Sequence, residues 1–277
     1  MMSQKSTLRS AALIGFYRFW HGWLHFKGAG VLLRIGARFF PELAHYPLSV
    51  PGIGTLNVNL RDASGFAWLN YSLDEAGHED GMIAALKKLA PPNPVVWDIG
   101  ANAGFFVATL AKRLASHAEI RMFEPNPGLM AVLQQLVACL PNTQAHHLAF
   151  SDVAGNLVLH IPPGQSTVAS LTPKPGSVPV TVACTTGDLF LKTTGAADPD
   201  VVIIDTEGND ARVILGLNEL IQRKQPVIFF EHLFLSEDVV RATLPAGYRH
   251  FTVDDCSGEL VPGWNPNRGH NSAFVPV

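Results

Sequence analysis

The chain has 277 residues, of which 47% are hydrophobic and 16% charged, so it can bury the core of one large domain or two small ones. Its formal net charge is −3, but residues 1–41 contain six Lys and Arg and no Asp or Glu, which leaves 14 basic and 23 acidic side chains for the rest. That acidic body argues against a nucleic-acid-binding protein. Three cysteines without a Cys-x-x-Cys pair exclude a cysteine zinc site and indicate a reducing compartment.

Residues 1–45 are predicted to form a basic, aromatic-rich helical extension. Between residues 24 and 40 the basic and apolar side chains fall on opposite helical faces. Two interpretations stay open: the helix packs its apolar side on the main domain, or residues 10–40 contact a membrane surface or another protein. Because Lys and Arg interrupt the apolar stretches, no transmembrane helix is predicted. We expect a cytoplasmic protein, with attachment to a membrane surface as the alternative.

Residues 46–277 are predicted to form one α/β domain. Its lead-in, residues 46–90, is expected to contain a small hairpin of strands 56–60 and 66–69, followed by a helix over 78–89. In the core, residues 91–277, apolar strands alternate with helices, which is typical of a doubly wound, mostly parallel sheet. The strands are expected at 95–99, 119–124, 144–150, 200–205, 226–231, 248–253 and 272–277, and the helices at 105–116, 128–139, 210–223 and 236–243.

An insertion at about residues 151–199 interrupts this alternation. Two further strands, 156–161 and 178–184, flank a loop rich in Gly, Pro, Ser and Thr. The loop, Pro162 to Ser177, is long enough to cover a substrate, although a surface insertion without a role would have the same composition.

A glycine turn follows the first core strand. Val95 to Ile99 runs into Asp98-Ile-Gly100-Ala-Asn102-Ala-Gly104, and a helix begins directly afterwards. A strand, a tight glycine turn and a helix N-terminus together form the nucleotide-binding crevice of open α/β sheets.

Acidic or polar side chains recur where the strands end, at the edge of the sheet that borders this crevice. They are Asp98, Glu124, Asp152, Asp205 with Glu207, and Glu231 with His232. Glu124 is placed to accept hydrogen bonds from both hydroxyls of a ribose, and Asp152 to reach an adenine amino group.

Three motifs carry a family resemblance: the turn Asp98 to Gly104, Phe123-Glu-Pro-Asn-Pro127, and Ile204-Asp-Thr-Glu-Gly208. Together they resemble the FkbM family of S-adenosylmethionine-dependent methyltransferases over about residues 56–277. The resemblance implies a seven-stranded, Rossmann-like sheet whose last strand is antiparallel. It also implies how the methyl donor is bound. Asp98, Gly100, Asn102 and Gly104 would hold its amino-acid end, Glu124 its ribose and Asp152 its adenine.

Two positions depart from the family pattern. The family usually has a lysine two positions before the aspartate of Ile-Asp-x-Glu-Gly, where this chain has Ile203. Three positions after the glutamate of that motif it usually has another glutamate, where this chain has Asp210. Both departures bear on substrate chemistry more than on donor binding.

The expected reaction is transfer of a methyl group from S-adenosylmethionine to a hydroxyl of a sugar, glycan or secondary metabolite. Such a hydroxyl must lose a proton, and the candidate catalytic residues are Glu207, His232 and Asp205, in that order, with Glu231 to orient them. These side chains could also hold a divalent cation, but nothing in their spacing requires a metal.

Two other functions stay open. A nicotinamide-dependent oxidoreductase expects Gly-x-Gly-x-x-Gly, whereas Asn102 replaces the middle glycine and no Tyr-x-x-x-Lys is present. A methyltransferase-like binding protein without catalysis would act through its basic N-terminal arm, and Ile203 and Asp210 are its support.

Overall fold

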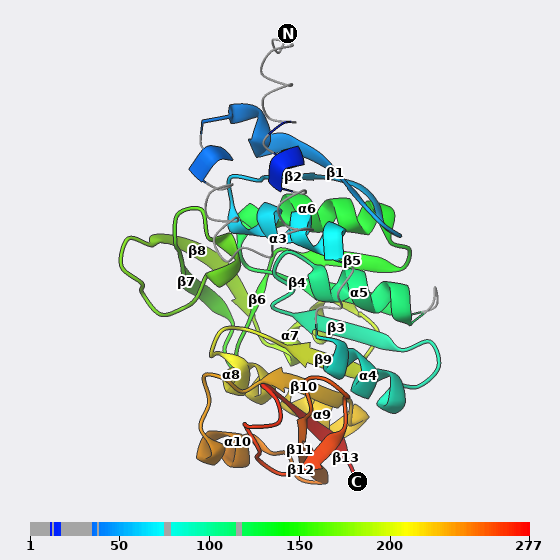
Figure 1. The fold of residues 1–277 in the computed structure, drawn as a ribbon. Coiled ribbons are helices and arrows are strands. Elements are labelled where there is room, and N and C mark those ends of the chain that lie inside the picture. Colours follow the sequence, from blue (N-terminus) through cyan, green and yellow to red (C-terminus); the bar gives the residue numbers. More distant parts are fainter. Residues whose placement is uncertain (1–11, 13, 18–34, 38, 75–78, 115–117) are drawn as a thin grey trace. The chain divides into compact units, whose positions relative to one another are not determined.

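The computed structural model describes residues 12, 14–17, 35–37, 39–74, 79–114 and 118–277 (Figure 1). The chain divides into two compact units, Met1–Ala76 with Pro163–Thr167, and Gly77–Pro162 with Val168–Val277. Most of the amphipathic helix expected between residues 24 and 40 lies outside the described residues, and the predicted boundary at residue 45 stays a prediction. No described helix is long and apolar enough to cross a membrane.

The described part of the first unit contains a hairpin and a helix. After the short 3-10 helix η1 (Pro41–His45), strands β1 (Tyr46–Val50) and β2 (Gly54–Val58) pair antiparallel. The strand predicted at 66–69 is wrong, because those residues lie within helix α3 (Ala63–Asp74). A run of four apolar residues does not distinguish a strand from a buried helix turn. The helix start was signalled instead by Asp62, whose carboxylate accepts a hydrogen bond from the Ser64 amide.

The second unit is built on an eight-stranded sheet. In chain order its strands are β3 (Val95–Ile99), β4 (Glu119–Phe123), β5 (Thr143–His146), β9 (Val201–Ile204), β10 (Val227–Glu231), β11 (Tyr248–Val253), β12 (Leu260–Pro262) and β13 (Asn271–Pro276). Their spatial order is β12-β11-β13-β10-β9-β3-β4-β5. The predicted mostly parallel, doubly wound sheet is confirmed, and β13 is antiparallel to both of its neighbours. Strand β12 extends the expected seven strands to eight by pairing with β11 at the edge.

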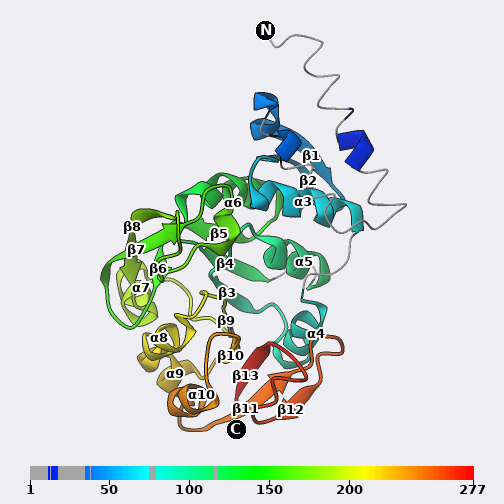
Figure 2. The same ribbon diagram turned by 60° about the vertical axis from the view of Figure 1, so that its left-hand side comes forward.

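Helices cover both faces of this sheet (Figure 2). They are α4 (Asp80–Leu89), α5 (Phe105–Arg113), α6 (Pro127–Cys139), α7 (Gly187–Thr194), α8 (Asp210–Leu215), α9 (Asn218–Lys224) and α10 (Glu237–Thr243). In Figure 2, α8, α9 and α10 lie on one side and α4 and α5 on the other. Alternate side chains of each strand point to opposite faces. Trp97 and Ile204 thus belong to the core packed under α8 and α9, whereas Asp98 and Ile203 face the other side.

Two predicted elements are divided in the structure. The strand expected at 144–150 becomes β5, in the main sheet, and β6 (Ala149–Phe150), which pairs with β8 (Val178–Thr185). Strands β7 (Gly155–Ile161), β8 and β6 form a separate three-stranded sheet. The helix expected at 210–223 is interrupted at Gly216, where a Cβ would lie 2.1 Å from the Ser151 carbonyl oxygen. Both interruptions arise from contacts between distant segments, which periodicity does not report.

At Gly100 the backbones that follow β3 and β9 approach each other closely. Its φ is +92°, and a Cβ there would lie 1.7 Å from the Asp205 carbonyl oxygen. Because that oxygen belongs to the backbone, it cannot move aside as a flexible side chain would. The two strand ends are also joined by a hydrogen bond of 2.9 Å from the Asp205 amide to the Ile99 carbonyl.

We expect Gly100→Ala to lower the free energy of unfolding far more than Gly176→Ala. Gly176 has a similar φ of +75° with nothing within 4 Å of its Cβ position, so its substitution adds only the left-handed backbone strain of about 1–2 kcal/mol. Urea unfolding followed by circular dichroism measures both variants. Equal losses of stability would contradict the contact described for Gly100.

Candidate active site

The turn after β3 is closed by hydrogen bonds within the protein. The Phe123 carbonyl accepts from the amides of Gly100, at 2.9 Å, and Ala101, at 3.1 Å. The amide of Asn102, a residue with a left-handed φ of +53°, donates to Glu124 Oε2 at 2.8 Å. These three amides are therefore committed to protein acceptors. A nucleotide phosphate bound by the backbone of this turn would instead need them free.

Glu124 braces this turn from the end of β4. Its carboxylate is buried, and Oε1 accepts a 2.6 Å hydrogen bond from the Asn126 amide while Oε2 accepts from Asn102. Burial raises the pKa of Glu124 to about 7, and the two amide hydrogen bonds act in the opposite direction. Each carboxylate oxygen has two lone pairs, so one on each remains for a ligand hydroxyl. The predicted ribose contact is compatible with this geometry.

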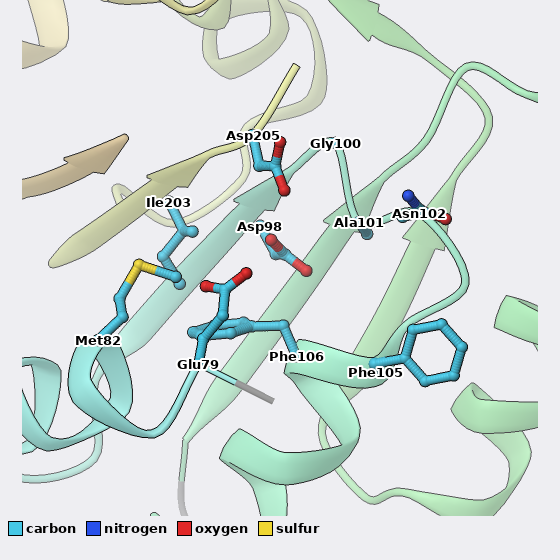
Figure 3. A pocket seen from close by; sticks show the side chains of 10 residues that line it. All are labelled: Glu79, Met82, Asp98, Gly100, Ala101, Asn102, Phe105, Phe106, Ile203 and Asp205. Atoms are coloured by element: carbon cyan, nitrogen blue, oxygen red, sulfur yellow. The ribbon is translucent and has the colours of Figure 1, made fainter. Parts of the chain in front are cut away.

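A small pocket opens beside the turn, and three carboxylates converge in it (Figure 3). Asp98 comes from β3, Asp205 follows β9, and Glu79 precedes α4. Apolar side chains, including Met82 and Phe106, line the rest. The cavity volume of about 60 Å³ is enough for a few water molecules or a small charged group, and too small for a whole nucleoside.

Sequence reasoning did not identify Glu79 as a site residue. Glu79 falls in the first turn of the helix predicted over residues 78–89, a position where an acid stabilises the helix dipole. In the structure it lies just before α4 in a left-handed conformation, with a φ of +60°, and its side chain points into the pocket. No pattern in the sequence relates this position to Asp98, because the contact arises from how α4 packs on the sheet.

Burial dominates the electrostatics of the pocket. It raises the pKa of Asp98 to about 8, with the charges of Glu79 and Glu124 adding to the effect. It raises the pKa of Glu79 to about 7 and that of Asp205 well above its usual range, and Glu231 adds to both shifts. Asp98 is 3% exposed, and its Oδ2 has no hydrogen-bond partner among the described residues. Such an arrangement favours a ligand that brings positive charge and hydrogen-bond donors.

None of the described residues that line this pocket is basic, and Ile203 contributes to that charge imbalance. It pairs in register with Asp98 on the neighbouring parallel strand and is buried beside it. This is the position at which the family resemblance leads one to expect a lysine. An isoleucine there places a hydrocarbon side chain next to the carboxylate, so burial is not offset by a positive charge.

The turn after β9 presents Glu207. The buried Asp210 carboxylate accepts hydrogen bonds from the amides of Thr206, at 3.3 Å, and Gly208, at 3.2 Å, which holds the turn from inside. Glu207 has a left-handed φ of +53°, and its carboxyl is half-buried. Burial raises the pKa of Glu207, while the ammonium of Lys174 lowers it. Asp210, at the second departure from the family pattern, thus has a structural role.

Glu231 ends β10 and His232 follows it directly, but the two side chains have different surroundings. The His232 ring is buried, its Nδ1 lies 2.9 Å from Ser272 Oγ, and its centroid is 4.6 Å from that of Trp264. Burial lowers the pKa of His232, which favours the neutral ring. Burial raises the pKa of Glu231 to about 7, and the charge of Glu207 adds to this shift, so Glu231 belongs to the acidic group at the strand ends.

Two residues that were predicted to bind the methyl donor do not face the acidic pocket in this way. Asp152 accepts a 3.0 Å hydrogen bond from Ser151 Oγ, lies 3.8 Å from the Arg212 guanidinium, and lines a different depression. A Cβ on Gly104 would lie 2.3 Å from Leu136 Cδ1, so this glycine permits close packing of α5 on α6. One pocket is thus lined by four of the predicted site residues, Asp98, Gly100, Asn102 and Asp205. Asp152 and His232 are not among the residues that line it. Among the described residues, no group of three or more His, Cys, Asp or Glu could hold a metal ion.

A family model described as "Methyltransferase FkbM domain" matches residues 98–250. The hexuronic acid methyltransferase AglP of Haloferax volcanii is 27% identical over 160 residues, which cover 57% of this chain and 64% of that protein. A crystal structure of methyltransferase FkbM from Methylobacillus flagellatus has 15% identity and a TM-score of 0.45, covering 89% of this chain and 60% of that one. The matches thus span less than two thirds of either relative.

We expect the protein without ligand to lose thermal stability as the pH rises from 5 to 8. Folded Asp98 keeps its proton up to a pKa of about 8, whereas the unfolded chain releases it near 3.8, so the folded state binds more protons across this range. Asp98→Asn keeps the shape and stays neutral, so the slope of melting temperature against pH should become shallower. Asp238→Asn, at an exposed position on α10, is the control and should keep the slope. An unchanged slope in Asp98→Asn would contradict this explanation.

The same measurement tests the role of Ile203. Ile203→Lys would place an ammonium beside Asp98 and lower the pKa of Asp98, because an opposite charge favours the ionised carboxyl. Ile203→Met, which is similar in length and uncharged, is its matched control. The slope of melting temperature against pH should be shallower in the lysine variant than in the methionine variant, and equal slopes would count against the proposed charge imbalance.

Proposed function

Because the chain belongs to the FkbM methyltransferase family, we propose that it transfers the methyl group of S-adenosylmethionine to a hydroxyl of a sugar, glycan or secondary metabolite. The choice of this methyl donor rests on the buried Asp98 carboxylate. One of its oxygens has no hydrogen-bond partner among the described residues, and the carboxylate faces two further acids. S-adenosylmethionine brings an ammonium and a sulfonium to such a site. A carbohydrate acceptor is supported by the name of the relative AglP, a hexuronic acid methyltransferase.

The pocket also supports this donor over a dinucleotide. Its size suits the amino-acid end of the donor, whose ammonium would bind Asp98 and Glu79. A pyrophosphate would meet three carboxylates there, and the amides of Gly100, Ala101 and Asn102 already donate to the protein. We therefore prefer a methyl donor to a nicotinamide cofactor. Glu124 would accept the ribose hydroxyls, and the adenine contact of Asp152 stays a prediction.

The chain's own residues would align the reactants and handle one proton. When bound, S-adenosylmethionine supplies an electrophilic methyl group on a sulfonium. The acidic edge of the sheet would hold this cation in line with the acceptor oxygen. Glu207 would take the acceptor's proton, because Asp210 holds its turn by two hydrogen bonds and because burial raises the pKa of Glu207, which makes its carboxylate a stronger base, while the charge of Lys174 limits that rise. Asp205 and Glu231 would complete the charge distribution around it.

His232 is the second candidate for the base. It is buried and its Nδ1 is engaged with Ser272, so Glu207 remains our first choice and His232 would act mainly as a support for the end of β10. The binding protein without catalysis is a weaker alternative. The presence of Asp210 in place of the family's usual glutamate favoured that alternative. In the structure, however, Asp210 accepts hydrogen bonds from the turn that carries Glu207, so a structural role accounts for it.

Calorimetry with S-adenosylmethionine and its demethylated product tests the proposal. The unaltered protein should bind both in the micromolar range, and Asp98→Ala should abolish binding, because it removes the buried carboxylate that faces the donor's ammonium. Asp238→Ala on the exposed side of α10 should bind as the unaltered protein does. Absence of binding to the unaltered protein would refute the proposed donor.

Transfer of a radiolabelled methyl group to a panel of glycans and metabolites tests the base. We expect Glu207→Gln to lower kcat by about 10²–10⁴, the usual contribution of a general base, with donor affinity retained. Ser272→Ala, which removes the partner of His232, should have a much smaller effect. If Glu207→Gln transfers methyl groups at the original rate, another residue accepts the proton.

A further inference from the structure

Two turns meet beside the proposed base, and one of them carries an exposed aromatic side chain. Phe234 follows β10, and it lies close to Gly208, the residue after Glu207. A Cβ on Gly208 would lie 3.4 Å from Phe234 Cβ and 3.8 Å from its Cγ. Gly208 has a φ of +99° and no side chain, so no side chain of its own separates its backbone from the phenylalanine. Phe234 is thereby held next to Glu207.

Phe234 is nevertheless largely open to solvent. It is 61% exposed, and its neighbour Leu233 is 53% exposed. A single exposed apolar residue is ordinary on a protein surface. Here, however, the exposed ring adjoins the edge of the sheet where Glu207 and Glu231 lie, so a large apolar surface and hydrogen-bonding carboxylates are presented side by side. Ligand sites commonly combine apolar side chains with a few polar groups in this way.

The two surfaces match the two kinds of surface on a sugar ring. A pyranose has a face of C–H groups, which can pack on the negatively charged face of an aromatic ring. Around its rim it has several hydroxyl groups, each a donor that a carboxylate can accept. A flat phenolic metabolite could use the aromatic surface as well, but it would offer the neighbouring carboxylates fewer donors.

We propose that Phe234 is the binding platform for a pyranose acceptor, whose C–H face stacks on the ring while its hydroxyl groups reach Glu207 and Glu231. This inference rests on the proposed methyltransferase function and specifies the class of its acceptor. A second copy of the chain is a poorer occupant. Two side chains bury at most a few hundred Å², whereas a stable protein interface buries about 800 Å² on each partner.

Saturation-transfer NMR on the full chain tests the platform. The protein is saturated with S-adenosylhomocysteine, and methyl pyranosides of glucose, galactose, mannose and glucuronic acid serve as probes. At least one pyranoside should receive saturation at its ring C–H protons. Phe234→Ala should weaken its binding about tenfold, corresponding to about 1.4 kcal/mol, and Phe234→Trp should preserve it because the aromatic face remains.

The control variant is Val239→Ala, which removes an exposed apolar side chain, 40% exposed, from helix α10, a helix that contributes no residue to the proposed site. It should bind the pyranoside as the unaltered protein does. Calorimetry with S-adenosylhomocysteine should give the same affinity for all four proteins. If no pyranoside contacts the loaded protein, or if Phe234→Ala binds it normally, the platform is refuted and the donor assignment stands. If the unaltered protein does not bind S-adenosylhomocysteine, both proposals fall.

Discussion

The backbone contact between the ends of β3 and β9 is the constraint on which the site depends. Gly100 lies so close to the Asp205 carbonyl that no side chain fits between them, and the Asp205 amide is bonded to Ile99. This contact brings the two strand ends together at the point where the order of the sheet reverses, which is where such sheets bind ligands. It also sets Asp98 and Asp205 close to each other. The acidic pocket is thus a consequence of how closely two backbones approach.

Close approach and burial together explain why the pocket favours a cation. Removing a carboxyl from water costs more than its neighbours' repulsion adds, and burial is accordingly the largest cause of the raised pKa of Asp98. Ile203 strengthens this effect by placing hydrocarbon beside Asp98. A ligand with positive charge would reverse the imbalance by favouring the ionised acids. Donor binding and proton release should therefore be linked in this protein.

Sequence reasoning was most successful where side-chain pattern and chain direction determine position. Apolar strands that alternate with helices predicted the parallel sheet, and acids at strand ends predicted the acidic edge, because parallel strands all end at the same edge. It was wrong about residues 66–69, which form helix α3, and it did not separate β5 from β6. In each case a short apolar run was compatible with more than one structure. Only packing against distant residues selected among them.

The sequence by itself determined the class of fold, the positions of most of its strands along the chain, and the family, through three motifs that each span only a few residues. The tertiary structure alone decided which predicted residues share a pocket. It added Glu79 to Asp98 and Asp205, placed Asp152 in another depression, and gave Asp210 and Gly104 structural roles. The physical reason is that local motifs encode backbone turns, whereas the direction of a side chain depends on packing between elements far apart in the chain.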